Sequence, residues 1–172
     1  MDSGVKTIKD MTPEVLEAIR RLANTRVMVG IPAENAFRDP EPGETATPPN
    51  NAELGYINEF GEPAMNIPPR PFLVPAMTEI QPEIISRLNK AADTALAGRQ
   101  EGVTKALMAL GMRCASAVQL KITNGPFKPL AEYTIWKRQH RKPPRMGTKP
   151  LMDLGHMRRA VTFAIRNIGK PR

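Results

Sequence analysis

Two long runs of apolar residues at helical spacing occupy the middle of the chain, at 71–95 and 102–122. Apolar residues that recur every three or four positions favour amphipathic helices, each of which buries one face. Proline lacks the backbone donor that a helix interior needs, so Pro75 and Pro82 predict a kink or a break near Ile80. The chain is thereby constrained to a fold built around two long helices.

Short strands are predicted near opposite ends of the sequence. Over 25–31, Val27 and Val29 alternate with other residues, a pattern typical of a half-buried strand. The same alternation recurs from Val161 to Arg166. The two strands would pair most simply in one antiparallel sheet. We therefore expect an α+β fold in which this small sheet packs against the two long helices, within a single domain spanning 1–172.

Shorter helices are predicted around this frame. Thr12 can cap a helix over 13–23, and a further helix covers 130–139. Asp153 is predicted to cap a short turn that follows it.

The segment 51–77 predicts a short helix, a glycine stop and a proline-stiffened elbow. Asn50 or Asn51 can cap this helix, and Gly61 can end it. The residues predicted to share its apolar face are Leu54, Ile57 and Phe60. The segment contains no catalytic apparatus, so we interpret it as built to hold a shape or a neighbour.

The chain contains 18 prolines, which is well above average usage, and they are clustered. Residues 33–49 combine four prolines with acids and few apolar residues, which predicts a long flexible loop. Residues 141–150 are both proline-rich and basic, which predicts an irregular arm. Folded elements should therefore alternate with long, stiff connections.

Basic charge is concentrated in the last third of the chain. From Gly125 onward, twelve basic residues stand against only Glu132 and Asp153. Such a block can face solvent, nucleic acid or an acidic protein surface. The residues we expect to face DNA or an acidic partner are Lys137, Arg138, Arg141, Lys142, Arg145 and Lys149.

Catalytic signals are few. Cys114 is the only cysteine, which excludes an intrachain disulfide and a cysteine zinc cluster, and its place on an apolar stripe predicts a packed side chain. His140 and His156 lack other ligands at metal-binding spacing, so no metal or cofactor is expected. Asp153 and His156 leave a hydrolase as a minor alternative. We expect a protein that is not an enzyme.

The sequence predicts neither a signal peptide nor a membrane span. The N-terminal residues lack the order of a basic and then an apolar region, and no apolar run approaches about 18 residues. We expect synthesis in a cytoplasm and no membrane partner.

Three motifs in order carry a family resemblance: Asn58 to Gly61 (NEFG), Pro68 to Leu73 (PPRPFL), and Leu151 to Arg159 (LMDLGHMRR). Together with the strand that ends at Pro32, they resemble the neck and tail-completion proteins of long-tailed bacteriophages, the minor tail components of virion morphogenesis. The resemblance covers about 26–168. The chain departs from it mainly in the length of its loop at 33–49 and its arm at 141–149.

The resemblance implies a structural virion protein without catalytic activity. Such proteins form a ring at the head–tail junction, where they join the tail to the capsid and let DNA pass. The implied partners are further copies of the chain, connector or adaptor proteins, and tail-tube or terminator proteins, with unspecific contact to packaged DNA as an additional possibility. A tail terminator that caps the tail tube is the alternative within this class, and an unspecific nucleic-acid-binding module is the alternative outside it.

A ring needs an interface between two different patches, which stiff proline segments can form with little loss of ordering entropy. We expect the interface among Phe60, Ile67, Pro68, Arg70, Phe72, Leu73, Trp136, Pro143 and Pro144. The sequence leaves open whether Phe72 packs in its own subunit or in the next one.

Overall fold

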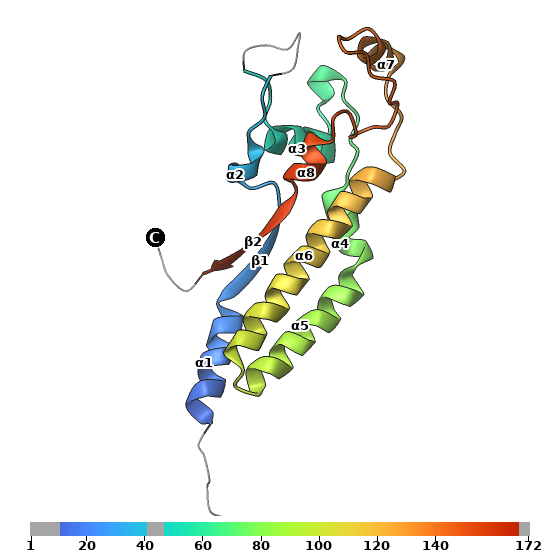
Figure 1. Cartoon of the computed structure of the whole chain (residues 1–172). Coiled ribbons are helices and arrows are strands. Elements are labelled where there is room, and N and C mark those ends of the chain that lie inside the picture. The colour runs from blue at the N-terminus through green and yellow to red at the C-terminus, as the bar shows by residue number, and fades with distance from the viewer. Residues whose placement is uncertain (1–10, 41–46, 169–172) are drawn as a thin grey trace, which may run out of the picture.

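The structure is a computed structural model that describes residues 11–40 and 47–168. Figure 1 shows an elongated molecule with α1 at one end and α3 and α7 near the other. The elements, in chain order, are α1 (Thr12–Ala23), β1 (Thr25–Gly30), α2 (Ala33–Ala36), α3 (Asn51–Phe60), the 3-10 turn η1 (Pro63–Met65), α4 (Leu73–Glu79), α5 (Gln81–Leu96), α6 (Gln100–Asn124), α7 (Glu132–Gln139), α8 (His156–Ala160) and β2 (Thr162–Asn167).

The two strands pair in antiparallel fashion, which confirms the predicted sheet. Thr25 lies opposite Asn167, and Gly30 lies opposite Thr162. Beyond the last pair, the Ile168 N–H donates to the Asn24 carbonyl at 2.7 Å. Two strands that lie far apart in the sequence are therefore joined in the middle of the molecule (Figure 1).

The long helices pack side by side, and α6 lies directly against both strands (Figure 1). The predicted break near Ile80 is confirmed, because Ile80 ends α4 and precedes α5. Pro82 consequently stands in the first turn of α5, where its missing N–H has no intrahelical partner to lose. Two helices separated at this position replace one interrupted helix.

Helix α6 contributes to both parts of the core. Toward the α3 end, Val118 and Ile122 pack with Phe72 and with Val161, the residue that precedes β2. Toward α1, the core consists of Ala18, Ala95, Val103 and Leu107. At Gly111 an added Cβ would lie 2.2 Å from the Phe163 ring, so glycine allows strand β2 to approach the helix closely.

The predicted loop at 33–49 is more ordered at both ends than expected. Ala33–Ala36 forms the short helix α2, and Ala36 is buried. The Arg38 Nε–H donates to the Pro49 carbonyl at 2.8 Å, which closes the segment. The remaining part of this prediction, residues 41–46, lies outside the described residues.

Two predicted caps are wrong. Thr12 is the first residue of α1 and Met11 precedes it, without a side-chain cap. Gly155, in a left-handed conformation with φ of 73°, precedes α8, whereas Asp153 binds arginine side chains. A short polar residue before an apolar stripe is thus insufficient to locate a cap, and at Asp153 the carboxylate binds arginine side chains instead.

Candidate interaction surfaces

Helix α3 begins and ends with local signals that set the direction of the elbow, residues 61–72. The Asn50 side chain accepts the N–H groups of Ala52 and Glu53, and Glu53 accepts the Asn50 N–H at 2.8 Å. This reciprocal arrangement is a capping box. At the other end Gly61 has a φ of 79°, and a Cβ there would lie 2.9 Å from the Ile67 carbonyl oxygen, so only glycine fits.

The buried face of α3 differs from the predicted one. Its buried residues are Asn51, Gly55 and Glu59, whereas Phe60 is exposed. The predicted apolar face is therefore wrong for Phe60. The two polar side chains on this buried face, Asn51 and Glu59, form hydrogen bonds with residues outside α3.

Glu59 connects α3 to α4. Its carboxylate accepts the backbone N–H groups of Phe72 and Leu73 at Oε2, at 2.7 and 2.9 Å, and that of Val74 at Oε1, at 3.0 Å. These donors belong to the first turn of α4, where the N–H groups have no intrahelical acceptor. Glu59 thus caps α4 from a distance and fixes the angle of the elbow.

Arg70 holds the other side of the elbow. Its Nε–H and Nη2–H donate to the carbonyl oxygens of Lys128 and Pro129 at 2.8 and 2.9 Å, and its backbone N–H donates to Asn58 at 2.7 Å. The side chain is buried, and burial together with the nearby Arg138 guanidinium lowers the pKa of Arg70. The elbow is therefore tied to the segment that leaves α6.

Asp153 fastens the basic arm, residues 141–150. Its carboxylate lies 2.8 Å from Arg145 Nη1, 3.3 Å from Arg141 Nη1 and 3.7 Å from Arg138 Nε. Arg138 also donates to the carbonyl oxygens of Gly147 and Lys149 at 3.1 Å. The arm lacks regular structure, as predicted, but it is folded back onto α7.

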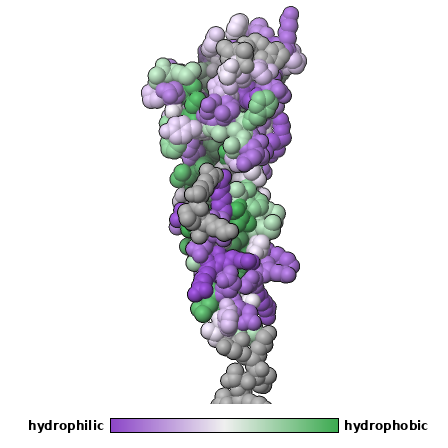
Figure 2. All heavy atoms as spheres, turned by 90° about the vertical axis from the view of Figure 1, so that its left-hand side faces the viewer, coloured by the Kyte–Doolittle hydropathy of each residue, from purple (hydrophilic) through white to green (hydrophobic). Residues whose placement is uncertain are grey.

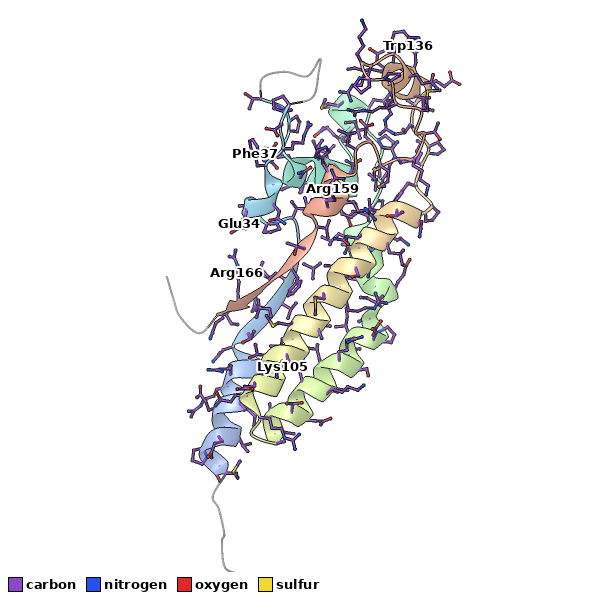
Figure 3. All side chains as sticks on the ribbon, viewed as in Figure 1. Glu34, Phe37, Lys105, Trp136, Arg159 and Arg166 are labelled. Carbon is purple, nitrogen blue, oxygen red and sulfur yellow. The ribbon has the colours of Figure 1, made fainter. Side chains whose placement is uncertain are left out.

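Aromatic side chains are exposed at this end of the molecule. The Tyr56 and Phe60 rings lie 4.8 Å apart on α3, and Trp136 stacks between Tyr133 and His140 at 6.1 and 4.4 Å. Figure 3 places Phe37, which is also exposed, and Trp136 at the end opposite α1. Several large aromatic surfaces are therefore available to a partner.

A pocket of about 260 Å³, here called the arginine pocket, is lined by both charged and apolar side chains and opens between α3, the elbow, α7 and the segment that precedes α8. Among the described residues, Asp153 is the only acid that lines it, and no serine, threonine or cysteine does. The charged or amide side chains that line it are Arg38, Asn51, Asn58, Arg70, Arg138, Asp153 and His156. These side chains offer hydrogen-bond donors and acceptors to a bound group.

A larger apolar groove of about 750 Å³ lies between β1, α4 and α5, with α6 residues such as Leu107 and Leu110 in its lining. Cys114 borders this groove but is buried, and burial raises the pKa of its thiol. The prediction of a packed cysteine is thereby confirmed.

The predicted interface residues divide into three groups. Phe72 and Arg70 are buried within their own chain, which answers for Phe72 the question that the sequence left open. Leu73, Ile67 and Pro68 are half-buried. The exposed members are Phe60, Trp136, Pro143 and Pro144.

The predicted DNA-facing or acidic-partner-facing residues divide as well. Arg138, Arg141 and Arg145 are turned toward Asp153, with 11%, 19% and 15% of their side chains exposed. Lys137, Lys142 and Lys149 are exposed, although Lys149 Nζ also donates to the Thr123 carbonyl at 3.0 Å. The arginines hold the arm in place, and the lysines carry the accessible charge.

Over 11–40 and 47–168, no group of three His, Cys, Asp or Glu side chains is placed to hold a metal ion. No helix within these ranges combines the length and the apolar character needed to cross a bilayer. Comparison of the chain with family models, with curated proteins and with solved structures yields no match.

Proposed function

We propose that this chain is a structural subunit of a long-tailed bacteriophage, assembled in the host cytoplasm into a homo-oligomeric ring at the head–tail junction. In the mature virion the ring joins the tail to the connector proteins of the capsid and leaves a passage for DNA. The proposal rests on the three sequence motifs and on the surface of the subunit.

The observation that carries the proposal is the distribution of apolar side chains. Among the described residues, more large hydrophobic side chains are exposed than buried, and almost half of the buried hydrophobic residues are alanines. Figure 2 shows green hydrophobic residues interspersed with purple hydrophilic ones over one long face. Scattered apolar side chains are common on monomeric proteins, so the support for assembly comes from the apolar groove of about 750 Å³ between β1, α4 and α5, which offers a continuous apolar surface to a neighbouring subunit.

The preformed elbow and arm support the same conclusion. Glu59 and Arg70 fix the elbow, and Asp153 fixes the arm, before any partner binds. Association requires less ordering of the chain when the contact surface is already rigid. Exposed residues next to these fixed segments, such as Phe60 and Trp136, are the proposed contacts.

Two measurements test the proposal. Mass photometry and negative-stain imaging of the purified chain should show a closed ring, and mass spectrometry of purified particles should detect the chain. A protein that stays monomeric at high concentration and is absent from particles would refute the proposal. Cryo-electron microscopy of particles then separates a connector-side neck ring from the alternative, a terminator on the last tail-tube ring.

A second candidate function is unspecific binding to nucleic acid. Lys137 and Lys142 are exposed near Trp136, and phosphate contacts by such residues give affinity that falls steeply with salt. If this function is correct, neutralising both lysines should abolish duplex DNA binding in a low-salt mobility-shift assay. Unchanged binding would exclude this surface as its origin.

A further inference from the structure

Among the described residues, Arg70 is a buried cation without a carboxylate partner. Only 7% of the residue is exposed, and within the described part of the chain its side chain bonds to two neutral carbonyl oxygens. Removing a charge from water is unfavourable unless an opposite charge compensates it. The carbonyl oxygens supply hydrogen bonds but no net negative charge, so they leave the positive charge of this guanidinium uncompensated.

Further arginine side chains line the same pocket as Arg70. Arg38 and Arg138 line the arginine pocket together with it, against the single carboxylate of Asp153. That carboxylate is shared with Arg141 and Arg145. Among the described residues that line the pocket, three arginines stand against one carboxylate, and such a lining favours an anion.

Asn51 provides an independent indication of a ligand. It lines the same pocket and is 4% exposed, and its Nδ2–H donates to the Phe37 carbonyl at 3.3 Å. Its Oδ1 is buried and has no hydrogen-bond partner among the described residues. A buried acceptor without a donor is unfavourable, so a ligand of this site should supply an N–H group as well as an anion.

We propose that the arginine pocket binds an acidic peptide segment of a partner protein, through an aspartate or glutamate side chain directed at Arg70 and a peptide N–H directed at Asn51 Oδ1. This inference rests on the proposed function for the nature of the partner, an adjoining protein of the head–tail junction.

The chemistry of the pocket favours a peptide over DNA. A phosphodiester offers acceptors only, whereas a peptide offers a carboxylate and N–H donors together. Leu54, Leu130 and Met157 also line the site, and they suit the apolar neighbours of an acidic side chain. A volume of about 260 Å³ is sufficient for one acidic side chain.

The test is an NMR titration of the isotope-labelled full chain with two blocked tripeptides, acetyl-Leu-Asp-Leu-amide and acetyl-Leu-Asn-Leu-amide. The aspartate peptide should give saturable shifts of the Arg70 Nε–H signal and should bind at least about tenfold more tightly than the asparagine peptide, because charge-assisted hydrogen bonds are stronger. Equal affinities, or no saturable shift, would overturn the proposal. Inorganic phosphate that binds more tightly than the aspartate peptide would overturn it in favour of a phosphate site.

A matched pair of variants locates the binding. Asn51→Asp places a carboxylate inside the pocket, so it should weaken binding of the aspartate peptide about tenfold or more. Asn50→Asp makes the same change of charge one residue earlier, at the helix cap outside the pocket, and should leave binding unchanged. Equal losses in both variants would contradict the assignment, and the comparison of the two peptides on the unmodified chain holds even if a variant fails to fold.

Ring formation by the same variants separates this inference from the proposed function. Rings formed by a chain that never binds the aspartate peptide would refute the pocket and leave the proposed function intact. Saturable binding by a chain that forms no rings and is absent from particles would refute the proposed function and leave the peptide-binding pocket intact.

Discussion

Glu59 is the side chain whose removal should reveal most about how the elbow is held. Its carboxylate accepts three backbone N–H groups across the gap between α3 and α4, and only 7% of the residue is exposed. Truncation in Glu59→Ala leaves three donors at the start of α4 without an acceptor. Loss of a charged hydrogen bond corresponds to about 1.5–3 kcal/mol, and loss of an ordinary helix cap to about 1 kcal/mol.

Because the three bonds share one carboxylate whose burial is itself unfavourable, we expect Glu59→Ala to reduce the free energy of unfolding by about 3 kcal/mol rather than by the sum of separate bonds. Glu59→Gln keeps one oxygen, which can still accept from Phe72 and Leu73, but its amide faces the Val74 N–H as a second donor. We expect a loss of about 1–2 kcal/mol for this variant.

Urea unfolding followed by circular dichroism measures these differences, and thermal unfolding should show a decrease of about 2–4 °C in Tm per kcal/mol for a chain of this size. Glu62→Gln is the matched control, since among the described residues the Glu62 side chain accepts only the Ala64 N–H, at 3.2 Å, in an exposed position. Its effect should stay below about 0.5 kcal/mol. If Glu59→Gln is as stable as the control, the carboxylate does not hold the elbow.

Four further outcomes are expected. Phe72→Ala should reduce the free energy of unfolding by about 3–5 kcal/mol in chemical denaturation, because the phenyl group is buried in its own subunit. A variant that remains a stable monomer and loses only oligomer assembly would contradict this. Gly111→Ala should reduce it by about 1–3 kcal/mol in the same assay, since the added methyl group meets a β2 aromatic ring, and an unchanged midpoint would show that the strand can shift. Cys114 should react with a thiol reagent only after unfolding, because burial raises its pKa and blocks access; rapid labelling of the native chain would refute its packing. The hydrogen bond from Arg87 is the main cause that lowers the pKa of Glu83, so this pair stabilises the fold fully above an ordinary glutamate pKa of about 4.3, and the contribution disappears as the pH falls through the lowered value. The free energy of unfolding of the unmodified chain should therefore exceed that of Glu83→Gln at neutral pH, and the two values should converge in acid. A difference that does not change with pH would contradict the lowered pKa of Glu83.

The frame of the fold was predictable from local patterns. Apolar periodicity located the long helices and the two strands, and the position of the prolines located the break at Ile80. Asn50 and Gly61 marked the ends of α3, because capping chemistry depends on residues close in sequence. These signals need no knowledge of the partner across space.

The polar contacts that shape the candidate surfaces were not predictable in the same way. Glu59 binds residues 13 to 15 positions later, and Arg70 binds carbonyl oxygens 58 and 59 positions later. Neither spacing corresponds to the period of a helix or a strand. Asp153 resembled a helix cap in sequence, and only the folded arm brings three arginines to it.

The pairing of β1 with β2 also fixes an order of events during synthesis. Thr25 finds its partner only when Asn167 has been translated, so all residues between the two strands must be synthesised before the sheet can form. The hairpin of α5 and α6 relies on contacts much closer in sequence and can form first. Until then β1 waits as an unpaired strand with apolar side chains, the kind of segment that associates with other nascent chains. A chaperone that shields this strand until β2 is available should therefore raise the yield of folded subunit.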